Sequence, residues 1–249
     1  MTNFSKNLLP FCFLSSLSAF SPIHDDEITV SAAASLRDVL TKIGADFQKT
    51  HPQKRVRFNF GSSGALQKQI EAGAPVDLFI CAAAKNMDAL AKKGEINSAT
   101  RRILARGELV LIAPRGSKLK SIRDLRFPSV KTLALGGPGV PAGDYARQTL
   151  RYLRLESAMQ TKLIFSKDVR AVLAQVAAGN TDAGFVYRTD ALTSKSIKIV
   201  AVAPPQSHTP IHYPLAIVKT APNPTGARAF WTYLQRPVAI QSLKKFGFK

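Results

Sequence analysis

The stretch FGSSGALQKQI (Phe60–Ile70) contains the transition that decides the fold. The β-rich run RVRFNF (55–60) ends there in glycine and serine, and Leu66 and Ile70 then lie four residues apart, the spacing of one helix face. A strand, a small polar turn and a helix leave unpaired backbone N–H groups at the first helical turn, pointing back over the strand end. Such a turn can bind an anion without a basic side chain, although serine and glycine are also ordinary residues at helix starts.

The segments on either side of this stretch alternate between expected strands and helices. EITVSAA (27–33) has the pattern of a short buried strand, and a helix is expected over 35–51, with Ser35 as its cap. DLFICA (77–82) predicts a third strand, and KNMDALAKKG (85–94) predicts a third helix closed by its glycine. This alternation favours a parallel sheet with crossover helices.

A second αβ unit follows from the longer apolar strand ELVLIAPRGS (108–117) onward. HYPLAIVK (212–219) is expected to pair with this strand as a return crossing, and the helical C-terminal segment is expected to pack on the first unit. The predicted fold is therefore α/β with two lobes, each a sheet flanked by helices, joined by two crossing strands around a hinged cleft. The expected boundaries are 25–107 with 214–249 for one lobe and 108–213 for the other. A single continuous sheet is the alternative.

Residues 1–24 have the order of a secretory signal peptide. Lys6 precedes the apolar run LLPFCFLSSLSAF (8–20), which is too short to span a bilayer, and small and then acidic residues follow. Without this leader, Cys81 is the one remaining cysteine, so no internal disulfide is expected. We expect a protein that is exported to the periplasm and is a monomer there.

The formal net charge of +19 is large for 249 residues. The basic residues are spread evenly along the chain, and no block of like charges, zinc-finger spacing or RNA-binding aromatic signature accompanies them. A nucleic-acid partner is therefore not expected. An even positive surface is instead suited to attracting small anions over a long range.

Further turns could converge with the GSSG turn on one cleft. Four turns rich in small residues each join an expected strand to an expected helix: SAAAS (31–35), GSSG (61–64), GGPGVPAGD (136–144) and SKDV (166–169). In open αβ sheets, ligands bind at the carboxyl ends of the strands, where these turns lie. Ser35 and Ser63 can add hydroxyl donors, and the strand AGFVY ends in the phenol of Tyr187. The pattern favours an anion site.

Several other chemistries lack their motifs. The sequence contains no phosphate-binding Walker lysine motif, no GxGxxG on the first strand, and no HExxH or CxxC metal pattern, so no cofactor is expected. Ser35 and Ser63 have no evident histidine base, which argues against a serine hydrolase. An enzyme that uses the Cys81 thiol stays open, although that cysteine lies in an apolar strand. A regulatory anion sensor would need a DNA-binding helix-turn-helix, which is not visible before residue 27.

Five segments together resemble the periplasmic molybdate-binding proteins of ABC uptake systems: EITVSAAASL, FNFGSSGALQKQIEAGAPVDLFI, GGPGVPAGDYARQTL, KDVRAVLAQV and GFVYRTDAL. They occur in order, and the resemblance covers nearly all of 27–249. It implies a two-lobed type II periplasmic-binding fold, molybdate or tungstate as the ligand, an ABC permease of the inner membrane as the partner, and no catalysis. By position, it implies oxyanion contacts at Ser35, Ser63, Ala142, Val169 and Tyr187. Gly64 stands where a relative can have serine.

The donor types suit a fully deprotonated dianion, because such an ion offers only hydrogen-bond acceptors. Hydroxyl and helix N–H groups donate without carrying a net charge. Phosphate keeps a proton at neutral pH and would need an acceptor in the site. Asp168 is the nearest candidate acceptor, but it is expected to cap its own helix. Sulfate, another tetrahedral oxyanion, and an enzyme on the same fold are the alternatives.

Overall fold

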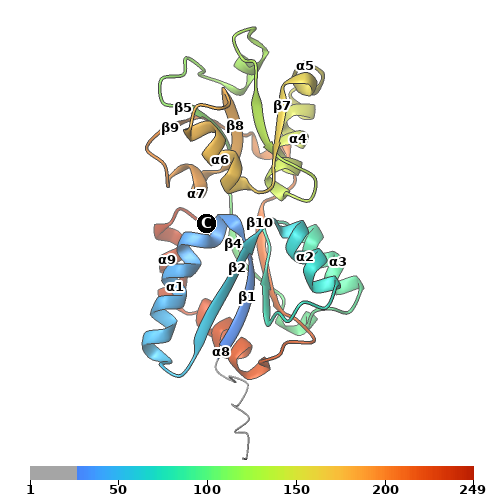
Figure 1. Cartoon of the computed structure of the whole chain (residues 1–249), viewed down its shortest axis with the longest axis vertical. Coiled ribbons are helices and arrows are strands. Elements are labelled where there is room, and N and C mark those ends of the chain that lie inside the picture. The colour runs from blue at the N-terminus through green and yellow to red at the C-terminus, as the bar shows by residue number, and fades with distance from the viewer. Residues whose placement is uncertain (1–26) are drawn as a thin grey trace, which may run out of the picture.

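The computed structural model describes residues 27–249. The expected signal peptide at 1–24 lies outside the described residues. The chain forms two five-stranded sheets, each flanked by helices. The two resulting lobes lie one above the other along the long axis of the molecule (Figure 1). We call the unit at the bottom of Figure 1 lobe 1 and the unit at the top lobe 2.

Lobe 1 contains the N-terminal and C-terminal segments of the described chain. Its elements are β1 (Glu27–Ala33), the 3-10 helix η1 (Ala34–Leu36), α1 (Arg37–Thr50), β2 (Arg55–Gly61), α2 (Ser63–Glu71), β3 (Leu78–Ile80), α3 (Ala84–Lys92), η2 (Ser98–Thr100), β4 (Arg102–Arg106), β10 (His212–Ile217), α8 (Pro224–Leu234) and α9 (Pro237–Lys245). The strand order is β2-β1-β3-β10-β4. β1 runs parallel to β2 and β3, as the alternation of strands and helices predicts, and β10 runs antiparallel to β3 and β4.

Lobe 2 is built from the middle of the chain. Its elements are β5 (Leu109–Pro114), η3 (Ile122–Arg126), β6 (Leu133–Gly136), α4 (Pro141–Tyr152), α5 (Glu156–Met159), η4 (Gln160–Lys162), β7 (Leu163–Ser166), α6 (Val169–Ala177), β8 (Ala183–Tyr187), α7 (Arg188–Ala191) and β9 (Ile197–Val202). The strand order is β7-β6-β8-β5-β9, in which β6 runs parallel to β7 and β8. The carboxyl ends of these parallel strands lead to the starts of α4 and α6.

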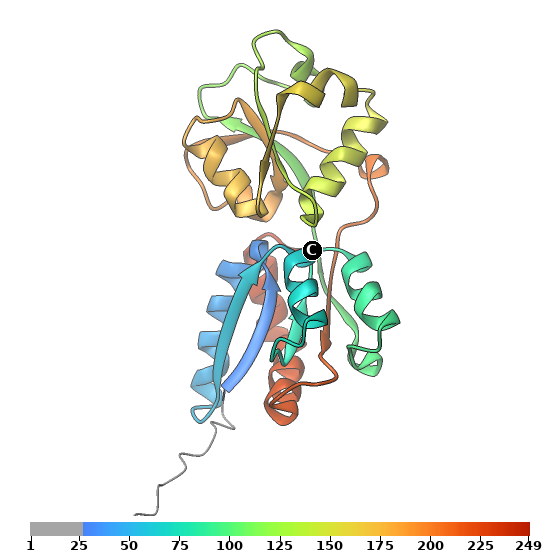
Figure 2. The same cartoon turned by 45° about the vertical axis from the view of Figure 1, so that its right-hand side comes forward.

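The chain crosses between the lobes twice, as Figure 2 shows. It passes from β4 to β5 through Gly107 and Glu108, and it returns from β9 to β10 through 203–211, which contains η5 (Pro205–Ser207). The backbone N–H of Gly107 donates to the carbonyl of Ile211 at 3.0 Å and so joins the two crossings. The two lobes are therefore joined by two connections that lie side by side.

The predicted pairing of 212–219 with 108–117 is wrong. β10 pairs with β3 and β4 in lobe 1, whereas β5 pairs with β8 and β9 in lobe 2. Each of the two strands lies inside its own sheet and has its backbone hydrogen bonds on both sides, so neither has a free edge for the other. The expected lobe boundary between 213 and 214 falls inside β10.

β4 was not expected from the sequence. The run RILAR is short, and its ends are exposed arginines, so it resembles a surface segment. It forms a strand because β10 offers it an edge, and the C-terminal residue covers part of it. Arg106 and Lys249 exchange backbone hydrogen bonds of 2.6 and 3.0 Å.

The predicted apolar stripe of α1 is confirmed. Leu36, Leu40, Ile43 and Phe47 are all buried, and the ring of Phe47 packs edge-on against Phe230 of α8, with 5.1 Å between centroids. The helices α8 and α9 pack beside α1, as expected for the C-terminal segment (Figure 1). Over residues 27–249, no helix combines the length and apolarity needed to cross a membrane.

Candidate functional site

Ser63 lies at the start of α2, in the turn between β2 and this helix. Ser62 is the N-cap of α2, and its hydroxyl accepts a hydrogen bond from the N–H of Ala65 at 3.3 Å. Ser63 is therefore free of the capping role. Its side chain is buried, and its Oγ accepts from the N–H of Ala82 at 3.0 Å. Since an accepting hydroxyl keeps its own proton, Ser63 can still donate to a ligand.

The expectation that Ser35 caps a helix is wrong. Ser35 lies inside η1, and α1 begins at Arg37 without a side-chain cap. The Ser35 hydroxyl instead donates to the Tyr213 hydroxyl at 3.3 Å, and its side chain is buried. Ser35 thus bonds to a residue 178 positions away in the chain and not to the backbone of the helix that follows it.

Ala142 and Val169 lie at the starts of the two lobe 2 helices that face lobe 1. Ala142 is the second residue of α4 and Val169 is the first residue of α6, and both are buried. Their apolar side chains offer no hydrogen-bonding group, but the first N–H groups of a helix have no partner within the helix. Asp168 caps α6 by accepting from the N–H of Ala171 at 2.9 Å, which confirms its predicted capping role.

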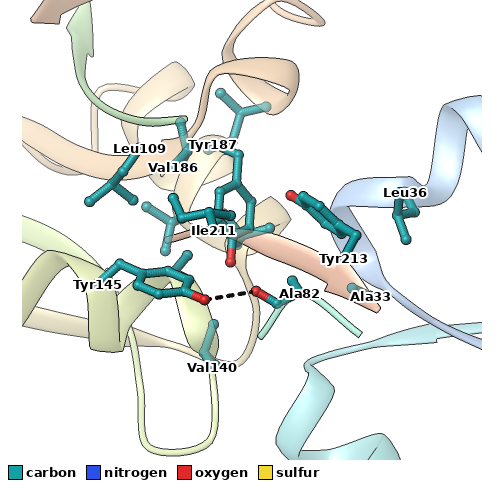
Figure 3. Packing of buried hydrophobic residues seen from close by; sticks show 14 of the residues in the cluster. Ala33, Leu36, Ala82, Leu109, Val140, Tyr145, Val186, Tyr187, Ile211 and Tyr213 are labelled. Carbon is teal, nitrogen blue, oxygen red and sulfur yellow. Dashed lines mark hydrogen bonds between the residues drawn. The ribbon is translucent and has the colours of Figure 1, made fainter. Parts of the chain in front are cut away.

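Tyr187 lies at the end of β8 with 1% of its surface exposed. Among the described residues, its hydroxyl has no hydrogen-bond partner. A buried hydroxyl without a partner is unfavourable, so we expect this hydroxyl to donate a hydrogen bond to a ligand bound between the lobes. Figure 3 shows the hydroxyl pointing toward Ala82 and the Tyr145 hydroxyl. Burial raises the pKa of Tyr187 well above its usual range, which keeps the phenol neutral and able to donate.

Two further tyrosines complete the surroundings of Tyr187, and the sequence reading missed both. The ring centroid of Tyr187 lies 5.7 Å from that of Tyr213 and 6.5 Å from that of Tyr145. The Tyr145 hydroxyl donates to the carbonyl of Ala82 at 3.2 Å and so connects lobe 2 to lobe 1 (Figure 3). Tyr145 lies three residues after Ala142 on α4, so its place near the same helix start could have been predicted from the sequence. Tyr213 lies on β10, and no local pattern singles it out.

The structure brings the five sequence-predicted residues together where the lobes meet. Contacts lead from Ser35 through Tyr213 to Tyr187, and from Tyr145 through Ala82 to Ser63. Ala142 is about one turn before Tyr145 on α4, and α6, which begins at Val169, packs against η1. Three hydroxyl groups, those of Ser35, Ser63 and Tyr187, and two helix starts thus surround one region between the lobes.

The lobes touch directly around this region. The N–H of Gly64 in α2 donates to the carbonyl of Gly139 in lobe 2 at 2.9 Å. Lys85 of α3 forms an ion pair with Asp144 of α4. Beside the site, a cleft of about 380 Å³ is lined by Lys85, Asp144, Tyr145 and His212 among others, but by none of the five predicted residues. The donors are therefore enclosed rather than open to this cleft.

No group of three or more histidine, cysteine or acidic residues within 27–249 is arranged to hold a metal ion. The donors around Tyr187 are hydroxyl and amide groups, so the arrangement is suited to hydrogen bonding an anion.

Comparison with known proteins relates this geometry to a family. Residues 28–249 match the family described as bacterial extracellular solute-binding protein. The chain is 39% identical to the molybdate-binding protein ModA of Haemophilus influenzae, over 92% of both chains. It is also 39% identical to the protein of the same name from Escherichia coli, over 97% of this chain and 96% of that one.

Among solved structures, the periplasmic molybdate-binding protein of Azotobacter vinelandii superimposes with a TM-score of 0.81 at 26% identity. The match covers 89% of this chain and 98% of that protein. The predicted two-lobed α/β fold is thereby confirmed. The chain belongs to the family of bacterial extracellular solute-binding proteins.

Proposed function

We propose that this chain captures molybdate or tungstate between its two lobes and delivers the ion to an ABC permease of the inner membrane. The observation that carries this proposal is the buried Tyr187 hydroxyl, which has no partner among the described residues. Its ring is connected by contacts to the buried Ser35, through Tyr213, and to the buried Ser63, through Tyr145 and Ala82. The proposed ligand contacts are Ser35, Ser63, Ala142, Val169 and Tyr187. The names of the relatives at 39% identity support molybdate as the ion.

The donor set explains how a dianion could be held without a cationic side chain among its direct contacts. A hydrogen bond to a charged group contributes about 1.5–3 kcal/mol. Several such bonds, after entropy losses, suffice for micromolar affinity, which corresponds to about −8 kcal/mol. Each donor is already held in place by the fold, so little ordering is required when the ion binds.

The same donors disfavour an ion that carries a proton. Monoprotonated phosphate would need an acceptor, and the nearest carboxylate in the sequence, Asp168, caps its own helix by accepting from the N–H of Ala171. Sulfate has the charge and shape of molybdate but is smaller, so it is the competitor that the binding experiment must separate.

An enzyme on this fold is less well supported. Cys81 was the candidate nucleophile, but it is fully buried and its Sγ donates to the carbonyl of Ala83 at 3.2 Å. Burial raises the pKa of the Cys81 thiol to about 12, so the reactive thiolate is scarce at neutral pH. We expect no cofactor and no catalytic turnover.

Export to the periplasm and action as a monomer are parts of the same proposal. The family description, extracellular solute-binding protein, supports a location outside the cytoplasm. Closure fixes the two lobes relative to each other, and a permease that contacts both lobes would recognise that arrangement.

Isothermal titration calorimetry of the purified protein with molybdate, tungstate, sulfate and phosphate tests the proposal. We expect micromolar or tighter binding of molybdate and tungstate and much weaker binding of the other two ions. A Tyr152→Phe variant, which removes an exposed phenol from α4, is a matched control and should bind as the unaltered protein does. Absence of molybdate and tungstate binding at micromolar concentration would contradict the proposal. Tighter binding of sulfate than of molybdate would show that sulfate is the ligand instead.

A further inference from the structure

Arg170 joins the two lobes through two carboxylates. Its Nε lies 2.6 Å from Oδ1 of Asp190 in lobe 2, and its terminal nitrogen lies 2.5 Å from Oδ2 of Asp38 in lobe 1. The other terminal nitrogen donates to the Thr193 hydroxyl at 3.2 Å. One guanidinium thus makes two contacts within its own lobe and one contact across the cleft.

Each of the three charged residues follows one of the proposed ligand contacts within three positions in the sequence. Asp38 follows Ser35 by three residues and Arg170 follows Val169 by one. Asp190 follows Tyr187 by three residues, in α7. Each charged side chain is therefore carried by a short, regular segment that also carries a donor. Bringing the charges together brings these donors together.

Burial distinguishes the two ion pairs of Arg170. The pair with Asp190 lies within lobe 2, whereas the pair with Asp38 depends on closure of the lobes. Asp190 is fully buried, so its carboxylate needs a partner within lobe 2, and Arg170 supplies that partner. Asp190 and Thr193 hold the guanidinium in place whether or not lobe 1 is near. The Asp38 side chain is 39% exposed and belongs to α1, so its contact with Arg170 exists only when the lobes meet.

We propose that Asp38 and Arg170 form a latch that stabilises the closed lobes, with Arg170 as a positioning residue prepared by Asp190. The latch rests on the proposed function, because its benefit to the protein is retention of the captured oxyanion. A contact that exists only in the closed state favours that state and therefore strengthens the binding of any ligand that requires closure.

Substitution of Asp38 tests this proposal, because the latch predicts in which direction the affinity for the anion changes. Removing a negative charge near an anion site should, by Coulomb's law alone, strengthen anion binding. The latch predicts the opposite, because neutral asparagine loses the ion pair with Arg170. For a partly exposed pair, we expect the dissociation constant for molybdate to rise about two- to fivefold in Asp38→Asn.

The test is a calorimetric titration of molybdate into the purified protein and its variants. Asp38→Glu keeps the charge and is expected to restore most of the affinity. Asp46→Asn removes an acidic group from the same helix whose partners are Lys42 and Lys49, so it is the matched control and should leave affinity unchanged. Unchanged or tighter binding by Asp38→Asn would overturn the latch.

A double-mutant background separates the latch from a general effect of Asp38. Replacing Arg170 alone would leave Asp190 buried and uncompensated, so Arg170→Gln is combined with Asp190→Asn. In that neutral background, Asp38→Asn is expected to lose its weakening effect. An equal weakening in both backgrounds would mean that Arg170 is not the partner through which Asp38 acts.

An interlobe distance gives a readout that does not depend on affinity. Spin labels at Lys92→Cys on α3 and Ser157→Cys on α5 lie at exposed positions of different lobes, while Cys81 is buried. We expect Asp38→Asn to enlarge the population with longer distances, both without ligand and at subsaturating molybdate. Identical distributions would overturn the latch. Failure of the unaltered protein to bind molybdate would instead contradict the proposed function, and the latch would then be judged on the ligand-free distances.

Discussion

The backbone N–H of Gly64 in lobe 1 donates a 2.9 Å hydrogen bond to the carbonyl of Gly139 in lobe 2. A Cβ atom at residue 64 would lie 2.5 Å from that carbonyl oxygen, so the contact requires glycine. Gly139 has a φ of +80°, a conformation that also favours glycine. At position 64 this chain has a residue without a side chain, which lets the two lobes touch.

Gly64→Ala is therefore expected to obstruct closure and to weaken molybdate binding. Overpacking of this kind typically costs about 1–3 kcal/mol, which corresponds to roughly 5- to 150-fold in the dissociation constant. Gly116→Ala is the control, because a Cβ there would meet nothing within 4 Å. Calorimetric titration of both variants checks the prediction, and equal affinities would show that the Gly64–Gly139 contact is dispensable for capture.

Ser63→Ala is expected to weaken molybdate binding by at least about 1 kcal/mol, because it removes a buried hydroxyl donor. Ser62→Ala serves as its neighbour control. Ser62 caps α2, so this change should lower the free energy of unfolding by about 1 kcal/mol and leave affinity nearly unchanged. Titration and chemical denaturation of both variants are the measurements. If Ser63→Ala binds as tightly as the unaltered protein, Ser63 does not contact the ligand.

Tyr187→Phe should affect stability and binding in different ways. The Tyr187 hydroxyl has no partner among the described residues, so its removal should leave the free energy of unfolding unchanged or raise it slightly. The same change removes a donor to the anion and should weaken binding by about 1.5–3 kcal/mol. Denaturation and titration on one preparation test both parts. A large loss of stability without a loss of affinity would contradict the assigned role.

Asp190 should make stability depend on pH. Burial raises the pKa of Asp190 from 3.8 to about 7, although Arg170 lowers it. Between these values, the folded protein holds a proton that the unfolded chain releases, so this group's contribution to stability is lost as pH rises toward about 7. Asp190→Asn lacks this titration.

The free energy of unfolding of the unaltered protein, measured relative to Asp190→Asn, is therefore expected to fall as pH rises from about 4 to 7. The slope should be at most about 1.4 kcal/mol per pH unit. Urea denaturation of both proteins across this range is the measurement, and it cancels the carboxylates that the two proteins share. A difference that stays constant with pH would show that Asp190 is ionised throughout.

Cys81 is expected to resist alkylation in the folded protein, because its thiol is buried and its pKa is raised to about 12. Iodoacetamide labelling followed by mass spectrometry should give slow modification without urea and rapid modification with it. Rapid labelling of the folded protein, with loss of a turnover activity, would revive the enzyme alternative.

Much of the fold follows from patterns that are local in sequence. The apolar stripe of α1, the strands β1 to β3 and the capping of α6 by Asp168 could all be predicted, because periodicity and helix caps depend on residues a few positions apart. The three hydroxyls among the proposed ligand contacts, those of Ser35, Ser63 and Tyr187, could likewise be picked out at or just after the ends of predicted strands.

Pairings between distant segments could not be predicted in this way. β5 and β10 have similar apolar sequences, so periodicity could not assign each to its own sheet, and it suggested that they pair with each other. β4 is a strand only because β10 offers it an edge. In both cases, the deciding hydrogen bonds lie between segments that the local pattern does not relate.

The sequence by itself determined that strands alternate with helices and that several helices begin in small-residue turns with free N–H groups. Local backbone geometry is enough for that. Only the tertiary structure decided that Ser35 contacts Tyr213, 178 residues away, and that Tyr145 connects the lobes through Ala82. It also decided that Arg170 lies between Asp38 and Asp190. These contacts depend on how two sheets are placed against each other, which is set by packing across the whole chain.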